Sequence, residues 1–465
     1  MIVRTLFKHE GRFAIGEVEV KLLPGVPQLH IVGQPDSQIR ECGIKLKSAL
    51  RSTQMEWPQG HQIVVNLRPA HFRKSSFGVE LAVALGFMAA TNQLSDTVRA
   101  KLSEAIVYGE LALDGRVFAP YDLASAIRSV KECLLSGEAQ DSVRDGRWWL
   151  LSTLNQQEPA LVQRNFDWQK FWRAPEFPDF EFHQKAADAL WLAAHMHLNI
   201  LLAGPQGSGK STWARALYSL TPAPTGAAMS ELMDLFGEEV LQQGWRPFEK
   251  PHHSITPLAM IGGGSPLFPG VISRAHGGML VMDEFLEFPA AVLEALREPI
   301  ENGHIEHARR GERARFPADF QLIGTTNLCP CGKLNPDPDK MKSCTHSLIR
   351  CRSVCARLSG PVMDRFDLVV MSHEWLQRGE RQRFSEIRST VEAVRDFARQ
   401  RGAVKGSIPA WVVQLELSHR RRNSLLRVAR GLADHARSVE IRDEHYRAAF
   451  DLAEKPMAHI QQLFA

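Results

Sequence analysis

The sequence predicts an α/β protein in three parts: an N-terminal α/β domain, a central domain built on a parallel sheet, and a small helical domain. Three observations predict this arrangement. A glycine-rich loop at 204–211 joins an apolar strand to a helix, strand and helix patterns alternate around it, and apolar residues repeat at helical spacing from about residue 376. Alternating strands and helices are typical of a parallel sheet covered by helices.

The composition is that of a globular protein with several domains. The chain has 465 residues, of which 44% are hydrophobic and 23% charged, an ordinary balance for a protein with a sizeable core. The net charge of +4 is too small to indicate a nucleic-acid partner by itself. No apolar run is long enough to span a membrane, and the N-terminus lacks the pattern of a signal peptide. We therefore expect a cytoplasmic protein without a membrane partner, whose seven cysteines are reduced.

Residues 1–150 alternate short apolar runs with turns, which predicts a compact α/β domain. Residues 151–178 are polar and aromatic and contain two prolines, so we interpret them as a linker. The elements expected in the first domain are strands at 18–20 and 62–67 and helices at 41–50 and 79–90.

The central domain is predicted over residues 179–375. We expect it to begin with a helix over 183–196 and an apolar strand over 198–203, with further buried strands at 279–282 and 320–324. Residues 376–465 show no further strand pattern, so a helical domain is expected there. Its helical repeats are Ile387, Val391, Val394 and Ala398, then Leu425, Val428 or Ala429, Leu432 and Ala436.

The glycine-rich loop has the pattern G-x-x-x-x-G-K-[ST], which binds nucleotide phosphates when it lies between a strand and a helix. Its backbone N–H groups point at phosphate oxygens, and the following helix adds its dipole. Lys210 is expected to reach the β- and γ-phosphates of ATP, and Ser211 to hold Mg²⁺. The residues expected to bind the nucleotide are Gly204, Pro205, Gln206, Gly207, Ser208, Gly209, Lys210, Ser211 and Thr212.

Polar residues end two other predicted strands of the central domain. Asp283 and Glu284 follow the apolar strand 279–282, and Asn327 follows the strand that begins near residue 320. Ligands gather at the carboxyl ends of parallel strands. We therefore expect Asp283 to hold Mg²⁺, Glu284 to polarise the attacking water, and Asn327 to orient that water beside the γ-phosphate. The pattern predicts an ATPase.

Short motifs in a fixed order along most of the chain resemble the AAA+ superfamily, and specifically the magnesium-chelatase-like proteins of the ComM and YifB type. The first domain carries motifs at 31–36 and 108–115, and the motor carries motifs at 251–253, 358–361 and 364–367. The resemblance implies a first domain similar to the Lon-type (S5-like) α/β fold, a central AAA+ P-loop core and a C-terminal helical lid.

The resemblance also implies a hexameric ring with ATP between subunits, and it adds two arginines to the site. Arg365 corresponds to the arginine finger, which stabilises transition-state charge on the neighbour's γ-phosphate. Arg420 matches the lid arginine that contacts the nucleotide of its own subunit. Arg421 and Arg422, in the same basic run, are alternatives to Arg420.

Five of the seven cysteines lie between Cys329 and Cys355. Relatives in the family commonly carry two C-x-C pairs in this region, and His346 falls where the fourth cysteine of those pairs is expected. A tetrahedral Zn²⁺ site of three cysteines and one histidine is chemically reasonable in reduced cytosol. Cys351 or Cys355 is an alternative to His346, and free cysteines in a loop are the other interpretation. The expected zinc ligands are Cys329, Cys331, Cys344 and His346.

Residues 301–316 have the pattern of a helix end followed by a β-hairpin with its turn near Arg310. In AAA+ motors of this clade a hairpin at this position points into the central pore, where arginines suit a phosphate backbone. An exposed charged hairpin without a ligand is the alternative. No base-reading motif is present, so we expect no sequence specificity. The arginines expected to contact DNA are Arg309, Arg310, Arg313 and Arg315.

The resemblance makes a DNA motor the leading hypothesis, with branch migration or helicase activity in homologous recombination or natural transformation. A chelatase-type ATPase that remodels a protein partner for metal insertion is one alternative, against which the long first domain argues. A Lon-like protease is disfavoured, because Ser75 and Ser76 precede a helix as its nucleophile does but no lysine follows 115–117 to activate a serine. A nucleotide-gated scaffold without catalysis is opposed by the intact Lys210 and Asp283.

Overall fold

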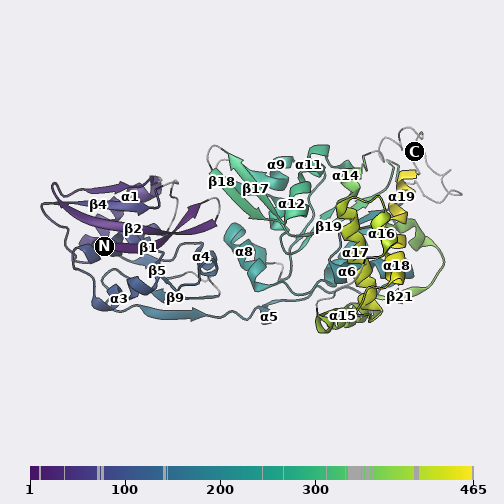
Figure 1. Cartoon of the computed structure of the whole chain (residues 1–465), viewed down its shortest axis with the longest axis horizontal. Coiled ribbons are helices and arrows are strands. Elements are labelled where there is room, and N and C mark those ends of the chain that lie inside the picture. Colours follow the sequence, from purple (N-terminus) through teal and green to yellow (C-terminus); the bar gives the residue numbers. More distant parts are fainter. Residues whose placement is uncertain are drawn as a thin grey trace. The chain divides into compact units, whose positions relative to one another are not determined.

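The structure of the protein is a computed structural model. Figure 1 shows its course from the N-terminus to the C-terminus. The residues that it describes are 1–9, 12–35, 37–70, 74, 78–139, 143, 145–242, 244–264, 267–309, 312–329, 331–332, 347, 350, 357–358, 360–402 and 408–462.

The chain forms two compact units. The first comprises Met1–Lys170, Met229–Gln242 and Glu306–Arg315, and the second comprises Phe171–Ala228, Gln243–Ile305 and Phe316–Ala465.

A mixed sheet of eight strands organises the first unit. Its centre is antiparallel, because β1 and β4 both pair antiparallel with β2, whereas β3, β5 and β8 join through parallel pairings. In sheet order the strands are β10 (Ala160–Arg164), β9 (Gly146–Leu150), β8 (Leu134–Ser136), β5 (Ile106–Val107), β1 (Ile2–His9), β2 (Arg12–Pro24), β4 (His61–Arg68) and β3 (Leu29–Val32).

Helix α2 (Val79–Ala90) forms the core of this unit and has the bounds that the sequence predicts. It is apolar on every side, and its residues from Val79 to Ala89 are all buried, as expected of a helix enclosed by a sheet and by other helices. It contacts β1, β2 and the amphipathic helix α1 (Ser37–Ser52). The remaining elements are α3 (Asp96–Glu104), α4 (Leu123–Ser129), β6 (Glu110–Leu111) and β7 (Val117–Phe118).

Residues 160–164 belong to this sheet, so the linker predicted over 151–178 is wrong for them. They form β10, which pairs antiparallel with β9 over its whole length. The segment after β10 is held by Asp145, whose carboxylate accepts hydrogen bonds from the backbone N–H of Phe166 and the indole N–H of Trp168. The polar composition of the segment concealed a strand whose stability comes from its partner strand.

A fully parallel sheet of five strands organises the second unit, which confirms the predicted α/β class. Every residue of its three central strands is buried, as expected of a parallel sheet covered on both faces. The order places the first strand in the sequence, β12, inside the sheet. In sheet order the strands are β13 (Phe248–Glu249), β16 (Met279–Met282), β19 (Gln321–Thr326), β12 (Ile200–Ala203) and β20 (Leu368–Met371).

Helices dominate the end of the chain, as predicted, but one strand lies in the region expected to be helical. β21 (Arg381–Arg383) pairs antiparallel with β11 (Glu181–His183). Aromatic packing of Phe182 and Phe177 against Phe384 accompanies this pair. The helices of the C-terminal region are α15 (Phe384–Arg401), α16 (Ala410–Gln414), α17 (His419–His435), α18 (Asp443–Ala453) and α19 (Lys455–Gln462).

None of the described helices combines the length and the apolar character that a membrane-spanning segment needs.

Short helices and strands make up the rest of the regular structure in the described chain. The other elements are α5 (Trp168–Phe171), α6 (Gln184–Met196), α7 (Lys210–Ser219), α8 (Gly226–Phe236), α9 (Pro257–Ile261), α10 (Val271–Arg274), α11 (Ala290–Ala295), α12 (Arg297–Asn302), α14 (Gly360–Met363), β14 (Gly262–Gly263), β15 (Phe268–Pro269), β17 (His304–Arg309) and β18 (Glu312–Pro317).

A buried carboxylate joins the C-terminal helices to α6. Asp434 on α17 lies 3.0 Å from His195 Nε2, 2.6 Å from Arg401 Nε and 2.8 Å from Arg430 Nη2. Burial alone would raise the pKa of Asp434, but the hydrogen bonds from His195 and Arg401 lower that pKa to about 2. The carboxylate therefore stabilises the fold above its unfolded pKa of about 3.9, and this stabilisation is lost as the pH falls through about 2.

We predict that Asp434→Ala lowers the free energy of unfolding by about 3 kcal/mol, because it leaves several buried cations without their counter-charge. Urea unfolding at neutral pH, followed by circular dichroism, measures the effect. The control is Asp396→Ala, which removes an exposed carboxylate from α15 and should change stability by less than about 0.5 kcal/mol. Equal unfolding midpoints for the two variants would contradict the prediction.

Candidate active site

The glycine-rich loop lies between β12 and α7, as its pattern predicts. Gly204 and Gly209 have φ angles of 147° and 89°, a region that side chains with a Cβ rarely enter. A Cβ on Gly204 would also lie 2.4 Å from Ser372 Oγ. Ser208 Oγ donates to the Pro205 carbonyl at 2.8 Å and lies 2.6 Å from Ser372 Oγ. The loop therefore has a fixed conformation at the N-terminus of a helix, where anions bind.

The ammonium group of Lys210 is the centre of the site. Its Nζ donates to the carbonyls of Gly204 at 2.9 Å and Pro205 at 2.8 Å, and to Asn327 Oδ1 at 3.0 Å. Burial lowers the pKa of Lys210 to about 8, and the nearby charge of Asp283 partly opposes this effect. At neutral pH the amine is therefore mostly a cation, held inside the loop where a phosphate would bind.

Asp283 lies at the end of the neighbouring strand β16. Its Oδ2 is 2.8 Å from Lys250 Nζ, and its Oδ1 accepts a hydrogen bond from Thr325 Oγ1. Burial alone would raise the pKa of Asp283, but the bonds from Lys250 and Thr325 hold it below its usual value. The group is therefore ionised at neutral pH, which a Mg²⁺ ligand requires.

Glu284 turns out of the strand. Its backbone has a φ of 54°, a left-handed conformation that is costly for a residue other than glycine. Its N–H donates to Thr325 Oγ1 at 3.1 Å, and its side chain is 53% exposed with His253 Nδ1 at 4.0 Å from Oε2. The carboxylate is thus accessible to a water molecule.

The structure brings three of the predicted catalytic residues together at the carboxyl ends of the parallel strands. β16, β19 and β12 are parallel neighbours, and Asp283, Asn327 and Lys210 follow or stand just beyond their carboxyl ends. Ser211 is exposed in the first turn of α7 beside them. A hydroxyl oxygen and an ionised carboxylate are the hard ligands that Mg²⁺ prefers, so Ser211 and Asp283 fit the predicted metal.

Arg365, one of the two arginines implied by the resemblance, lies at the amino end of the parallel strands, whereas the phosphate loop follows their carboxyl ends. Arg420 is the other arginine. Arg365 precedes β20, is 2% exposed, and donates from Nη2 to Glu294 Oε2 at 3.2 Å. Arg420 Nη1 lies 3.4 Å from Glu301 Oε1. Burial lowers the pKa of Arg420, and the nearby charge of Glu301 partly opposes this effect.

The expected contact of Arg420 with the nucleotide of its own subunit stays a prediction. Helix α17 is fixed at the amino end of β20, where Arg421 Nη1 donates to the Phe366 carbonyl at 2.7 Å. Because β20 and β12 are parallel, this end is about 13 Å from the carboxyl ends that carry the phosphate loop. Of the two alternatives to Arg420, Arg421 also pairs with Glu454, and Arg422 bonds to the carbonyls of Val413 and Leu415.

Two of the four predicted zinc ligands lie within the described residues. The Sγ atoms of Cys329 and Cys331 are 3.1 Å apart. Cys344 and His346, like Cys351 and Cys355, fall outside the described residues. Within the part of the chain that the structure describes, no group of three histidine, cysteine or acidic side chains is arranged to hold a metal.

The predicted hairpin is present as β17 and β18, which form a two-stranded sheet. Arg309 and Arg313 belong to its strands, and Arg315 is exposed on β18. Arg310 lies outside the described residues. The role of these arginines in DNA binding stays a prediction.

Three residues of the site escaped the sequence reasoning. Lys250 follows β13 and reaches Asp283 because β13 is the parallel neighbour of β16. Thr325 and Ser372 are polar side chains on or after buried strands, and each binds a residue of the site. All three residues lie at or near the carboxyl ends of strands of the parallel sheet. The order of these strands, which shows that the residues are close together, is known only from the structure.

The lowered pKa of Lys210 predicts that nucleotide affinity falls as the pH rises. Bound phosphate stabilises the ammonium form of Lys210. As the pH rises, Lys210 therefore loses its proton at a lower pH in the free protein than in the protein with ATP bound. The Kd for ATP should increase by up to about tenfold per pH unit above about pH 8. A fluorescent ATP analogue titrated between about pH 7 and 9.5 measures this. A constant Kd over that range would contradict the assignment, and a Lys210→Arg variant that still binds should show no such dependence.

Comparison with known proteins gives matches along most of the chain. The family model of the magnesium chelatase subunit ChlI matches residues 176–379, and a second model of the ChlI subunit matches residues 18–136. The chain is 30% identical to the uncharacterized protein YifB of Escherichia coli over 96% of each chain. It is 32% identical to the competence protein ComM of Haemophilus influenzae over 86% of this chain and 82% of that protein.

Proposed function

This chain belongs to the family of magnesium-chelatase-like AAA+ proteins that includes YifB and ComM, and from this we propose that it is an ATP-hydrolysing ring motor that acts on DNA. The observation that carries the ATPase part is the placement of Lys210, Asp283 and Asn327 around the phosphate loop. Each supplies a charge or hydrogen bond that phosphoryl transfer needs.

The roles of the side chains follow from their contacts. Lys210 exchanges its bonds to the loop carbonyls for bonds to the phosphates, and Asn327 keeps the amine in place. The exposed carboxylate of Glu284 polarises the water that attacks the γ-phosphate. Mg²⁺, held by Ser211 and Asp283 when bound, neutralises charge on the phosphates. Lys250 must then leave Asp283, so the ion pair competes with the metal.

We predict that Glu284→Gln lowers kcat by a factor of about 10² to 10⁴ while the affinity for ATP changes little, because the amide cannot polarise water but keeps the shape of the side chain. Steady-state hydrolysis and titration with a fluorescent ATP analogue separate the two effects. Glu287→Gln, which changes a carboxylate one turn further along the chain, is the control. Wild-type turnover in Glu284→Gln would remove Glu284 from the mechanism.

A ring completes the site from the neighbouring subunit in this proposal. Arg365 lies just before β20, at the amino end of the parallel strands and away from the chain's own phosphate loop, so it suits contact with the nucleotide of a neighbour. Arg365 must exchange Glu294 for that phosphate, because the glutamate holds its guanidinium in the isolated chain. This arrangement supports a homo-hexamer in which hydrolysis depends on assembly.

The proposed substrate is branched or single-stranded DNA, moved in branch migration during homologous recombination or natural transformation. The name of the Haemophilus relative, a competence protein, supports this. The hairpin of β17 and β18 also supports it, since it carries several arginines and includes the exposed Arg315. A chelatase-type ATPase acting on a protein partner is the second candidate, favoured by the two magnesium chelatase family models.

We predict that four-way-junction or forked DNA stimulates ATP hydrolysis several-fold. The stimulation should be lost in the double variant Arg309→Ala/Arg310→Ala, which should keep its basal turnover because neither arginine is among the residues expected to bind or hydrolyse the nucleotide. It should also fall steeply with salt, because phosphate contacts release counterions. Hydrolysis rates with single-stranded, duplex and junction DNA measure the effect.

The control for the hairpin variant is Arg297→Ala, which removes an exposed arginine from α12. Basal hydrolysis that no DNA changes would overturn the DNA motor and favour a protein client, as in the chelatase alternative. Stimulation that survives the hairpin substitutions would move the DNA contact elsewhere on the chain.

A further inference from the structure

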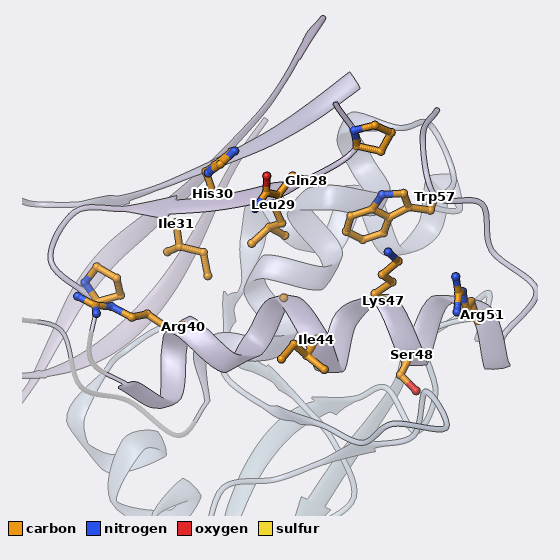
Figure 2. A pocket seen from close by; sticks show the side chains of 13 residues that line it. Gln28, Leu29, His30, Ile31, Arg40, Ile44, Lys47, Ser48, Arg51 and Trp57 are labelled. Carbon is orange, nitrogen blue, oxygen red and sulfur yellow. The ribbon is translucent and has the colours of Figure 1, made fainter. Parts of the chain in front are cut away.

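A groove in the first unit lies between the edge strand β3 and helix α1 (Figure 2). It has a volume of about 750 Å³. On one side β3 pairs in parallel with β4, and within the described residues no strand pairs with its other side. The strand therefore carries backbone groups that an additional strand can bind.

The groove is lined by positive charge. Arg40, Lys47 and Arg51 all project from α1, are exposed, and follow one another at helical spacing along one face. Figure 2 shows Arg40 near one end of the groove and Arg51 near the other. None of the residues that line the groove is acidic.

The groove is also apolar. Ile44, between Arg40 and Lys47 on α1, is 75% exposed, although a large aliphatic side chain gains free energy from burial. Leu29 and Ile31 also line the groove and point from β3 toward α1. An apolar centre with a charged rim is the composition of a protein–protein interface.

Trp57 offers a hydrogen-bond donor at one end. Its indole N–H is buried and has no hydrogen-bond partner, an arrangement that costs free energy unless an acceptor is supplied. The ring is stacked on Phe87 with centroids 5.4 Å apart, and Lys47 Nζ lies over it at 5.7 Å. Because its faces already have these neighbours, the ring is a poor stacking surface for a base.

We propose that this groove binds an extended, acidic peptide segment of a partner protein, which adds to β3 as a further strand. The peptide backbone pairs with the open edge of β3, its carboxylates meet Arg40, Lys47 and Arg51, and an apolar side chain covers Ile44. Strand addition to a sheet edge is a common mode of peptide recognition. Single-stranded DNA matches the charge but leaves the strand edge unpaired, so the peptide accounts for more of the groove. Binding here requires no nucleotide and is independent of the proposed DNA motor.

The test uses the full chain and a short fluorescein-labelled peptide of aspartate, glutamate and isoleucine residues, followed by fluorescence anisotropy. Lys47→Glu/Arg51→Glu should weaken binding at least tenfold, because reversed charges repel the peptide. Ile44→Asp should act in the same direction. The control Lys21→Glu reverses one charge on β2, next to buried Val20 and therefore on the other face of the sheet, and should alter Kd less than about twofold. Basal ATP hydrolysis shows that each variant is folded.

Two further arms distinguish strand addition from attraction of any anion. The same peptide with alternate backbone nitrogens methylated should bind at least tenfold more weakly, since it has lost main-chain donors. Hydrogen exchange should slow at residues 29–32 only when the unmodified peptide is present. Equal binding of the methylated peptide would overturn the proposal. The proposal would also be overturned if the peptide did not bind at all. It would be overturned as well if oligo(dT) displaced the peptide and no longer bound to Lys47→Glu/Arg51→Glu.

Discussion

The largely buried ammonium group of Lys210 requires hydrogen-bond acceptors, and these acceptors hold the carboxyl ends of the parallel strands together. A charged amine removed from water must find partners, and Lys210 finds two loop carbonyls and the amide oxygen of Asn327. Asn327 follows β19, and Thr325 of that same strand binds Asp283 at the end of β16. The ends of three neighbouring strands are thereby held in one arrangement before any nucleotide binds, so the site is largely preorganised.

The C-terminal helices position a second set of charges at the amino ends of the parallel strands. Asp367 accepts hydrogen bonds from Arg427 and Ser424, and Arg421 pairs with Glu454. These buried contacts fix α17 against the start of β20, and with it the surroundings of Arg365 and Arg420. In the proposed ring, the charges at the two ends of the strands belong to sites that neighbouring subunits complete together. Because subunits must associate to bring these charges together, hydrolysis would depend on assembly of the proposed ring.

The first unit uses a different architecture for a different purpose. Its antiparallel centre and the fully buried helix α2 make a stable support, while β3 at the sheet edge and α1 beside it form the basic groove. Natural proteins usually cover or charge an open strand edge to prevent aggregation. Here the charges have one sign and surround an exposed isoleucine, which is the arrangement expected of a surface kept open for an acidic partner.

The sequence by itself determined the nucleotide site and most of the regular elements. The phosphate loop, the strand before Asp283 and helix 79–90 have local signatures, because backbone conformation at glycines and unbroken apolar runs depend on neighbours in sequence. Tertiary structure decided what depends on distant partners. It placed Lys250 on Asp283 through the pairing of β13 with β16, made strands of residues 160–164 and 381–383, and joined Arg421 of α17 to the chain just before β20. Strand pairing and sheet order join segments far apart in the chain, so no local pattern encodes them.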